Sequence, residues 1–143
     1  MEDRAKVLIV DDEAGPRESL RMVLKPFYQV TTAASRQEAL QIVQTQQIDL
    51  VTLDLKMTDC TGTALLKELK FIQPELQAVI LTGYGTLKSA IEAIRYGAAD
   101  YLLKPFQVTE ILSVINRVLS RPATTGKMNA ALHELEHAEI SRP

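Results

Sequence analysis

Five short apolar runs alternate along the chain with longer segments whose apolar residues recur at helical spacing. A strand followed by a helix, repeated in this way, predicts a parallel sheet with its helical crossovers packed against it. We therefore expect an α/β fold made of five successive βα units. The expected strands are Lys6–Val10, Gln29–Ala33, Leu50–Leu53, Ala78–Leu81 and Tyr101–Leu103.

Three of these strands are almost continuously apolar, with the sequences VLIV, LVTL and AVIL. Such strands are typical of sheets covered on both faces, so we expect these three at the centre. The helical segments end at residues that interrupt helices: Pro26 after the first, Pro74 after the third, and Gly97, expected in a left-handed conformation, after the fourth. Ser35 and Glu38 have the spacing of a capping box at the start of the second helix.

The length of 143 residues and the hydrophobic content of 46% predict one domain plus a tail, with a core that needs no disulfide or metal for stability. The net charge of −2 argues against a non-specific nucleic-acid or membrane-surface binder. The single cysteine, Cys60, cannot form an intramolecular disulfide, and no signal peptide or membrane span is evident. We therefore expect a cytoplasmic location, and we interpret Cys60 as a loop residue without a catalytic role.

The composition changes at SRPATTG, residues 120–126, and a helical pattern resumes in KMNAALHELEHAEI. Two interpretations stay open for this tail: a linker helix that frays in isolation, and the start of a connector to an output domain. His133 and His137 lie four residues apart there, but no further ligand in a recognised metal spacing accompanies them. We interpret both histidines as solvated.

Polar residues that can carry chemistry follow the expected strands. Asp11 and Asp12 follow the first strand, Asp54 the third, Thr82 the fourth and Lys104 the fifth. Ligands of parallel α/β sheets bind at the carboxyl ends of the strands, so the three carboxylates lie close together if the first and third strands are neighbours. Clustered carboxylates repel one another unless a cation lies among them, and all-oxygen ligands favour Mg²⁺ or a similar hard ion.

A metal bound there leaves one carboxylate available to attack a phosphoryl group and form an aspartyl phosphate. Lys104 can supply a cation to the phosphoryl oxygens, and Thr82 a hydroxyl donor. Glu13 is not assigned to the metal site, because an acidic side chain at the start of the first helix also interacts well with the exposed amide dipoles.

Two competing motifs fail at specific positions. The segment DLKMT, residues 54–58, resembles the nucleophile loop of haloacid-dehalogenase-type phosphatases, but Lys56 stands where their second aspartate is required. The segment GYGTLKS, residues 83–89, lacks glycines that nucleotide-binding loops need, because Leu87 and Lys88 stand in their place. We interpret this second segment as a turn into the fourth helix.

The combination of VLIVDDE, DLVTLDLKMTDCTG, VILTGYG and GAADYLLKPF closely resembles the receiver domain of two-component response regulators. The TGYG turn and AIRYGAADYLLKPF are most similar to the nitrogen-regulator class of receivers, the sigma-54 activators. The resemblance implies a doubly wound, flavodoxin-like sheet of order 2-1-3-4-5. We expect residues 1–121 to form the receiver domain and residues 122–143 a linker or connector helix to an output domain outside these 143 residues.

The resemblance also implies roles for the acidic residues. Asp54 is expected to be the phosphoacceptor. Asp12 and Asp54, together with the backbone carbonyl of Lys56, are expected to bind Mg²⁺ or Mn²⁺ directly, and Asp11 through water. Thr82 and Lys104 are expected to hold the phosphoryl oxygens.

The same resemblance implies a switch next to the site. Tyr101 is expected to turn inward when Thr82 moves, which changes the surface formed by the fourth helix, fifth strand and fifth helix. The peptide bond before Pro105 is expected to be cis, a form that is uncommon without a structural reason.

Two departures from the family pattern concern the loops. Receivers usually have methionine-proline after the phosphoacceptor, and here Met57 is followed by Thr58, which we expect to loosen the loop geometry. Lys56 and Tyr84 each lie two residues beyond a key position, so we expect them to set the lifetime of the phosphate.

We therefore expect a switch in which a sensor histidine kinase phosphorylates Asp54 and the phosphate shifts a pre-existing equilibrium toward an active surface. A homodimer through that surface and a transcriptional output are further expectations. The domain is expected to act by binding rather than as an enzyme, while assisting its own phosphorylation and dephosphorylation, with no direct contact to nucleic acid or membrane.

Two rival functions use the same residues. A small Mg²⁺-dependent phosphohydrolase is disfavoured by Lys56. An interaction module that is never phosphorylated is disfavoured by the intact set of strand-end residues.

Overall fold

The five expected strands form one parallel sheet in the order β2-β1-β3-β4-β5. A computed structural model describes residues 4–83 and 85–120. The flavodoxin-like order implied by the resemblance is confirmed, and the three continuously apolar strands occupy the centre. The strands are β1 (Lys6–Val10), β2 (Gln29–Ala33), β3 (Leu50–Leu53), β4 (Gln77–Thr82) and β5 (Asp100–Leu103).

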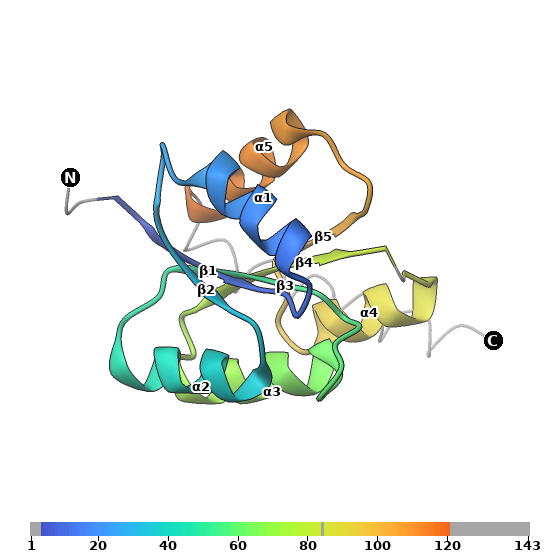
Figure 1. The fold of residues 1–143 in the computed structure, drawn as a ribbon. Helices are drawn as coiled ribbons and strands as arrows, with labels where there is room; N and C mark the ends of the chain where they lie inside the picture. Colours follow the sequence, from blue (N-terminus) through green and yellow to red (C-terminus); the bar gives the residue numbers. More distant parts are fainter. Residues whose placement is uncertain (1–3, 84, 121–143) are drawn as a thin grey trace.

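Two helical layers cover the sheet (Figure 1). The helices are α1 (Ala14–Leu24), α2 (Arg36–Thr45), α3 (Gly62–Ile72), α4 (Leu87–Arg95) and α5 (Val108–Leu119). Helices α1 and α5 lie on one face, and α2, α3 and α4 on the other. Within β1, Val7 and Ile9 pack into the first layer while Leu8 and Val10 pack into the second, because successive strand side chains point to opposite faces.

The local signals at helix ends are largely confirmed. Helix α1 ends at Leu24, two residues before Pro26, and Gly97 follows α4 with a φ of 104°. The Ser35 hydroxyl accepts a hydrogen bond from the Glu38 amide, as expected of a capping box. The Glu38 carboxylate, however, accepts from the Ala34 amide rather than from that of Ser35, so the return bond is displaced by one residue.

Several expectations fall on residues that the structure does not describe. The tail over residues 122–143, with His133 and His137, lies outside the described residues, as does Tyr84. Among the helices of residues 4–83 and 85–120, none is long and apolar enough to cross a bilayer.

Candidate functional site

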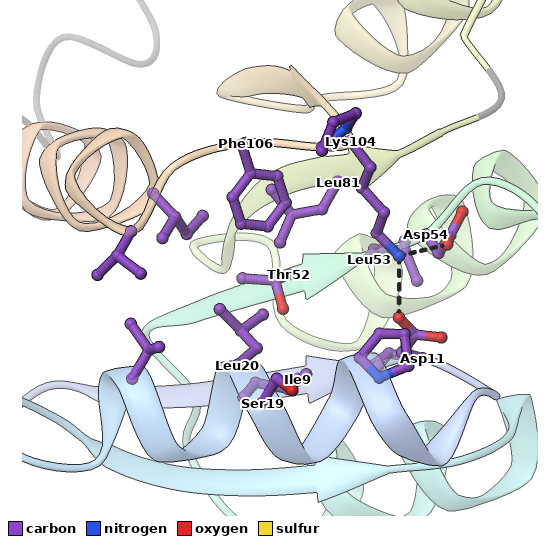
Figure 2. A pocket seen from close by; sticks show the side chains of 16 residues that line it. Ile9, Asp11, Ser19, Leu20, Thr52, Leu53, Asp54, Leu81, Lys104 and Phe106 are labelled. Atoms are coloured by element: carbon purple, nitrogen blue, oxygen red, sulfur yellow. Dashed lines mark hydrogen bonds and ion pairs between the residues drawn. The ribbon is translucent and has the colours of Figure 1, made fainter.

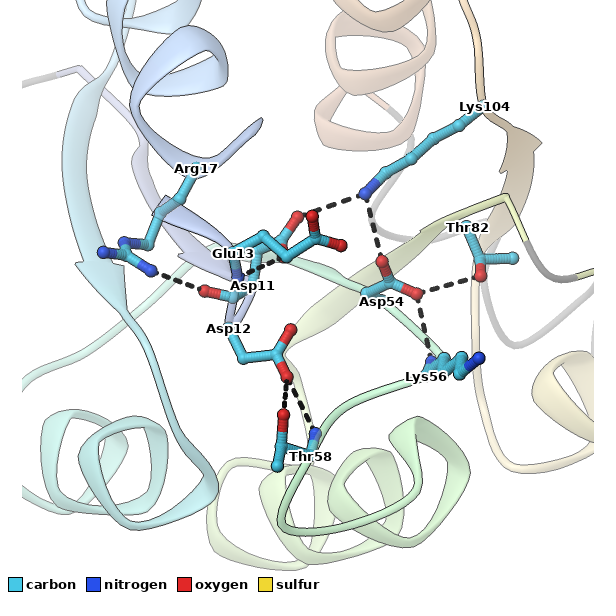
Figure 3. Close-up of polar contacts among 9 residues, drawn as sticks. All are labelled: Asp11, Asp12, Glu13, Arg17, Asp54, Lys56, Thr58, Thr82 and Lys104. Carbon is cyan, nitrogen blue, oxygen red and sulfur yellow. Dashed lines mark hydrogen bonds and ion pairs between the residues drawn. The ribbon is translucent and has the colours of Figure 1, made fainter. Parts of the chain in front are cut away.

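The carboxyl ends of β1, β3, β4 and β5 bring the predicted strand-end residues together (Figure 3). Parallel pairing of β1 with β3, and of β3 with β4, places Asp11, Asp54 and Thr82 at the same end of the sheet. Lys104 reaches the same place from the end of β5. The proximity of Asp11 to Asp54, which depended on β1 and β3 being neighbours, is therefore observed.

The buried Asp54 carboxylate has hydrogen-bond donors on both oxygens. Its Oδ1 accepts from the Thr82 hydroxyl at 2.9 Å and from the Lys56 amide at 3.0 Å. Its Oδ2 accepts from the Lys104 ammonium at 3.0 Å. These donors fix the orientation of the carboxylate and compensate its charge in a site that is largely shielded from water.

The Lys104 ammonium lies between two carboxylates, 3.1 Å from Asp11 and 3.0 Å from Asp54. Burial alone would lower the pKa of Lys104, but the hydrogen bonds and charges of Asp54 and Asp11 outweigh it and raise that pKa above its ordinary value. The peptide bond between Lys104 and Pro105 is cis, as the resemblance implies.

A cavity of about 320 Å³ between α1 and α5 adjoins this ion-pair cluster (Figure 2). Its walls are mainly apolar, and the charged residues that line it are Asp11, Asp54 and Lys104. Apolar surface on this side reduces the solvent screening of the two ion pairs.

The acidic cluster extends beyond the two buried carboxylates. One carboxylate oxygen each of Asp11, Asp12 and Glu13 lie within 4.8 Å of one another. Glu13 is the N-cap residue of α1, yet its side chain makes no capping hydrogen bond. Glu13 thus lies with the two aspartates that precede it. The run of three consecutive acids in the sequence was the signal that Glu13 belongs to this cluster.

The donor set of this cluster suits a hard divalent cation. All three side chains offer carboxylate oxygen, the ligand that Mg²⁺ and Mn²⁺ accept, and the exposed position of Glu13 leaves room for the waters that Mg²⁺ retains. The residues present therefore fit a magnesium site.

Comparison with known proteins agrees with the geometry. The sequence matches the response regulator receiver domain family over residues 7–116. The chain belongs to this family. It is 32% identical to the transcriptional regulatory protein ZraR of Escherichia coli (strain K12), over 99% of this chain and 36% of ZraR. The chain thus spans just over a third of the length of that relative.

Two further relatives match the receiver along most of their own length. Sporulation initiation phosphotransferase F of Bacillus subtilis (strain 168) is 38% identical, over 80% of this chain and 93% of that protein. The crystal structure of a receiver domain protein from Methanospirillum hungatei JF-1 has a TM-score of 0.81 at 28% identity, covering 85% of this chain and 98% of that one. The match to ZraR supports the nitrogen-regulator class of receivers. Receivers of this family are signalling domains that work with histidine kinases.

The loop after Asp54 differs from the sequence-based expectation. Thr58 was expected to loosen this receiver's loop, but its amide and hydroxyl both donate to Asp12 Oδ2, at 2.8 and 2.5 Å. The Thr58 hydroxyl bond is the largest cause that holds the pKa of Asp12 below its ordinary value, against the opposing effect of burial. The loop is therefore tied to the end of β1.

The start of α3 lies directly against the backbone of Asp54 and Leu55. The Gly62 amide donates to the Leu55 carbonyl at 2.8 Å. A Cβ at Gly62 would lie 2.4 Å from the Asp54 carbonyl oxygen, so any larger residue would displace the backbone that carries Asp54.

The expected switch residue of the receiver, Tyr101, contacts α4. Its hydroxyl lies 3.2 Å from Ser89 Oγ. Ser89 also forms a reciprocal capping box with Thr86 at the start of that helix. The partner of Tyr101 was not identified from the sequence, although the Thr86–Ser89 spacing was a visible capping signal.

Proposed function

We propose that this receiver is phosphorylated on Asp54 by a sensor histidine kinase and that the phosphate switches the surface formed by α4, β5 and α5. The observation that carries the proposal is the convergence of the Thr82 hydroxyl and the Lys104 ammonium on the two oxygens of the Asp54 carboxylate. The same two donors are placed to bind phosphoryl oxygens once Asp54 carries the phosphate. The output is proposed to be transcriptional, as the similarity to the transcriptional regulatory protein ZraR suggests.

The proposed transfer forms one bond and breaks one. A carboxylate oxygen of Asp54 attacks the phosphorus of a phosphohistidine on the kinase. The P–N bond breaks, and its electron pair returns to the imidazole nitrogen, which takes up a proton. Lys104 and Thr82 stabilise the negative charge on the phosphoryl oxygens as the group moves.

Magnesium, or manganese in its place, is proposed to be held by Asp11, Asp12 and Asp54 with the backbone carbonyl of Lys56. Asp11 is proposed to act through water, and Glu13, which lies with Asp11 and Asp12, adds a further carboxylate near the ion. When bound, the cation neutralises charge on the phosphoryl oxygens.

The switch is proposed to run from Thr82 through Tyr101 to α4. Thr82 would exchange its bond to Asp54 for one to the phosphate, and Tyr101 would turn inward and leave Ser89. Exposed apolar side chains on α4 and β5 support this surface as a contact for an output domain or for a second copy of the receiver; they are Leu87, Ile91 and Leu103.

The phosphate is proposed to be lost by slow hydrolysis that the domain itself assists. Lys56 and Tyr84, two residues beyond Asp54 and Thr82, are the side chains proposed to set its lifetime. The domain thus signals by binding and does not turn over a metabolite.

Intact-mass spectrometry after incubation with Mg²⁺ and acetyl phosphate tests the proposal. The expected result is one added phosphoryl group, absent from Asp54→Asn and retained in Asp59→Asn, a matched control in the same loop. An adduct that survives Asp54→Asn would refute the assignment of the phosphoacceptor. Continuous release of phosphate without an adduct would favour the phosphohydrolase, and neither adduct nor release would favour the interaction module.

A further inference from the structure

Thr58 places both of its hydrogen-bond donors on a single oxygen. Its amide and its hydroxyl donate to Asp12 Oδ2, across a sequence separation of 46 residues. The contact joins the loop between β3 and α3 to the end of β1 (Figure 3). A proline at this position, which is usual in the resembling family, would have neither donor.

Neither bond from Thr58 involves the other carboxylate oxygen of Asp12. Figure 3 shows this oxygen pointing away from Thr58, on the side of Asp11 and Glu13. The three acidic side chains offer oxygens within 4.8 Å of one another, so the orientation that Thr58 imposes is compatible with a shared cation.

Fixing Asp12 in advance changes the cost of binding a metal. A free aspartate side chain loses rotational freedom when it becomes a ligand, and a side chain that is already held loses less. Hydrogen-bond partners of metal ligands act in this way, and their removal typically weakens metal binding by about 10- to 100-fold. Thr58 is exposed, so water can replace part of what it supplies, and the lower end of that range applies.

We propose that Thr58 is a positioning residue for the metal site: it holds Asp12 Oδ2 so that the other oxygen of Asp12 faces the cation. This inference rests on the proposed function, because it takes the acidic cluster to be the magnesium site of the receiver. Thr58 itself touches neither the ion nor the phosphoryl group.

The test compares Mg²⁺ affinity in three variants by titrating ¹⁵N-labelled protein with MgCl₂ and following the amide resonances. Thr58→Val removes the hydroxyl while keeping the shape, and we expect its Mg²⁺ affinity to fall about tenfold. Thr58→Ser keeps the hydroxyl, and its Mg²⁺ affinity should stay within about twofold of the wild-type affinity. A twofold change is smaller than the loss of affinity expected when one hydrogen bond is removed. Thr45→Val, which removes a hydroxyl that donates to the carbonyls of Gln41 and Ile42 within α2, is the matched control and should leave the Mg²⁺ affinity unchanged.

A second readout separates a metal effect from a structural one. The rate of phosphorylation by acetyl phosphate should be slower in Thr58→Val at low Mg²⁺ and should reach the wild-type rate at saturating Mg²⁺. A deficit that persists at saturation would overturn the inference, because Thr58 would then act on the phosphoryl transfer or on folding.

The remaining outcomes distinguish this inference from the proposed function. If wild type binds Mg²⁺ and is phosphorylated while Thr58→Val binds Mg²⁺ as tightly or more tightly, only the role of Thr58 is overturned. If wild type binds no Mg²⁺, the metal site is overturned together with the role of Thr58.

Discussion

Replacing Lys104 by methionine should destabilise the metal-free receiver and tighten its binding of Mg²⁺. The ammonium contacts Asp11 Oδ2 at 3.1 Å and Asp54 Oδ2 at 3.0 Å, so both carboxylates lose the same counter-charge in one substitution. Methionine keeps most of the side-chain length and its apolar packing, which isolates the effect of the charge.

The burial of the three side chains sets the magnitude. The side chain of Lys104 is 26% exposed, and those of Asp11 and Asp54 are 9% and 11% exposed. Exposed ion pairs contribute about 0.2–1 kcal/mol, whereas removing one partner of a buried pair costs about 3–5 kcal/mol. This cluster lies between the two cases, and we expect the free energy of unfolding to fall by about 2 kcal/mol in the absence of metal.

The pH range over which wild type and Lys104→Met differ in the free energy of unfolding follows from the raised pKa of Lys104. A cationic group whose folded pKa lies above its unfolded value stabilises the fold at pH values below the unfolded pKa, and the contribution is lost as pH rises through the folded pKa. With an ordinary value of 10.5 for Lys104, the full difference between wild type and variant is expected at neutral pH and should vanish only in strong alkali.

Urea unfolding followed by circular dichroism, in EDTA and in saturating MgCl₂, measures the effect. Because the variant lacks the competing ammonium, its Mg²⁺ affinity should rise about tenfold, which narrows the difference in unfolding free energy by about 1.4 kcal/mol. Lys88→Met, on the exposed side of α4, is the control and should change neither the free energy of unfolding nor the Mg²⁺ affinity. A Lys104→Met protein as stable as wild type in EDTA would refute the reasoning, as would a stability difference that Mg²⁺ does not reduce.

Two further predictions concern Ser89 and Cys60. Ser89→Ala removes the hydroxyl that accepts a hydrogen bond from the Thr86 amide at the start of α4 and that contacts Tyr101. Urea unfolding should therefore show a loss of about 1 kcal/mol and hydrogen exchange should accelerate in the first turn of α4, whereas the exposed Ser113→Ala should change neither stability nor exchange. Burial, and then the neighbouring Asp59 carboxylate, raise the pKa of the Cys60 thiol from 9.0 to about 11. The higher pKa lowers the fraction of thiolate at pH 8, although each thiolate is then more nucleophilic. Alkylation of Cys60 by iodoacetamide at pH 8 should therefore be about tenfold slower in the folded protein than in urea-unfolded protein, and equal rates would contradict this.

The strands and helices were predictable because their determinants are local, whereas the order of the strands in the sheet was implied by the resemblance to receiver domains. Alternating β-branched runs and helical periodicity located all five strands, and the errors lie at their ends. Strand β4 includes Gln77 and Thr82, which the apolar run AVIL does not contain. Strand β5 begins at Asp100 rather than Tyr101. Backbone hydrogen bonding continues past the last apolar side chain, so hydrophobicity alone marks the middle of a strand better than its ends.

The sequence predicted the positions of those site residues that directly follow a strand, because the course of the backbone alone places them. Asp54, Thr82 and Lys104 follow strands, so their convergence follows from strand order. The partners of Asp12 and Tyr101 depend on how loops and helix ends close over the sheet. Thr58 and Ser89 supply those partners from distant segments, and no periodic pattern connects them to the residues they contact.

The charges at the strand ends explain why hydrogen-bond donors and a bound cation would both stabilise this site. The Lys104 ammonium pairs with the carboxylates of Asp11 and Asp54, and Asp12 and Glu13 bring two further carboxylates close to Asp11. Neutral donors from Thr58 and Thr82 lower the cost of these charges but cannot cancel them. The remaining negative charge disfavours the fold without a cation and would favour the binding of a divalent ion. The same carboxylates that limit stability are therefore the ones that would bind the metal. A change that removes one of these acids should therefore stabilise the metal-free protein while it weakens Mg²⁺ binding, because both effects arise from the same charge.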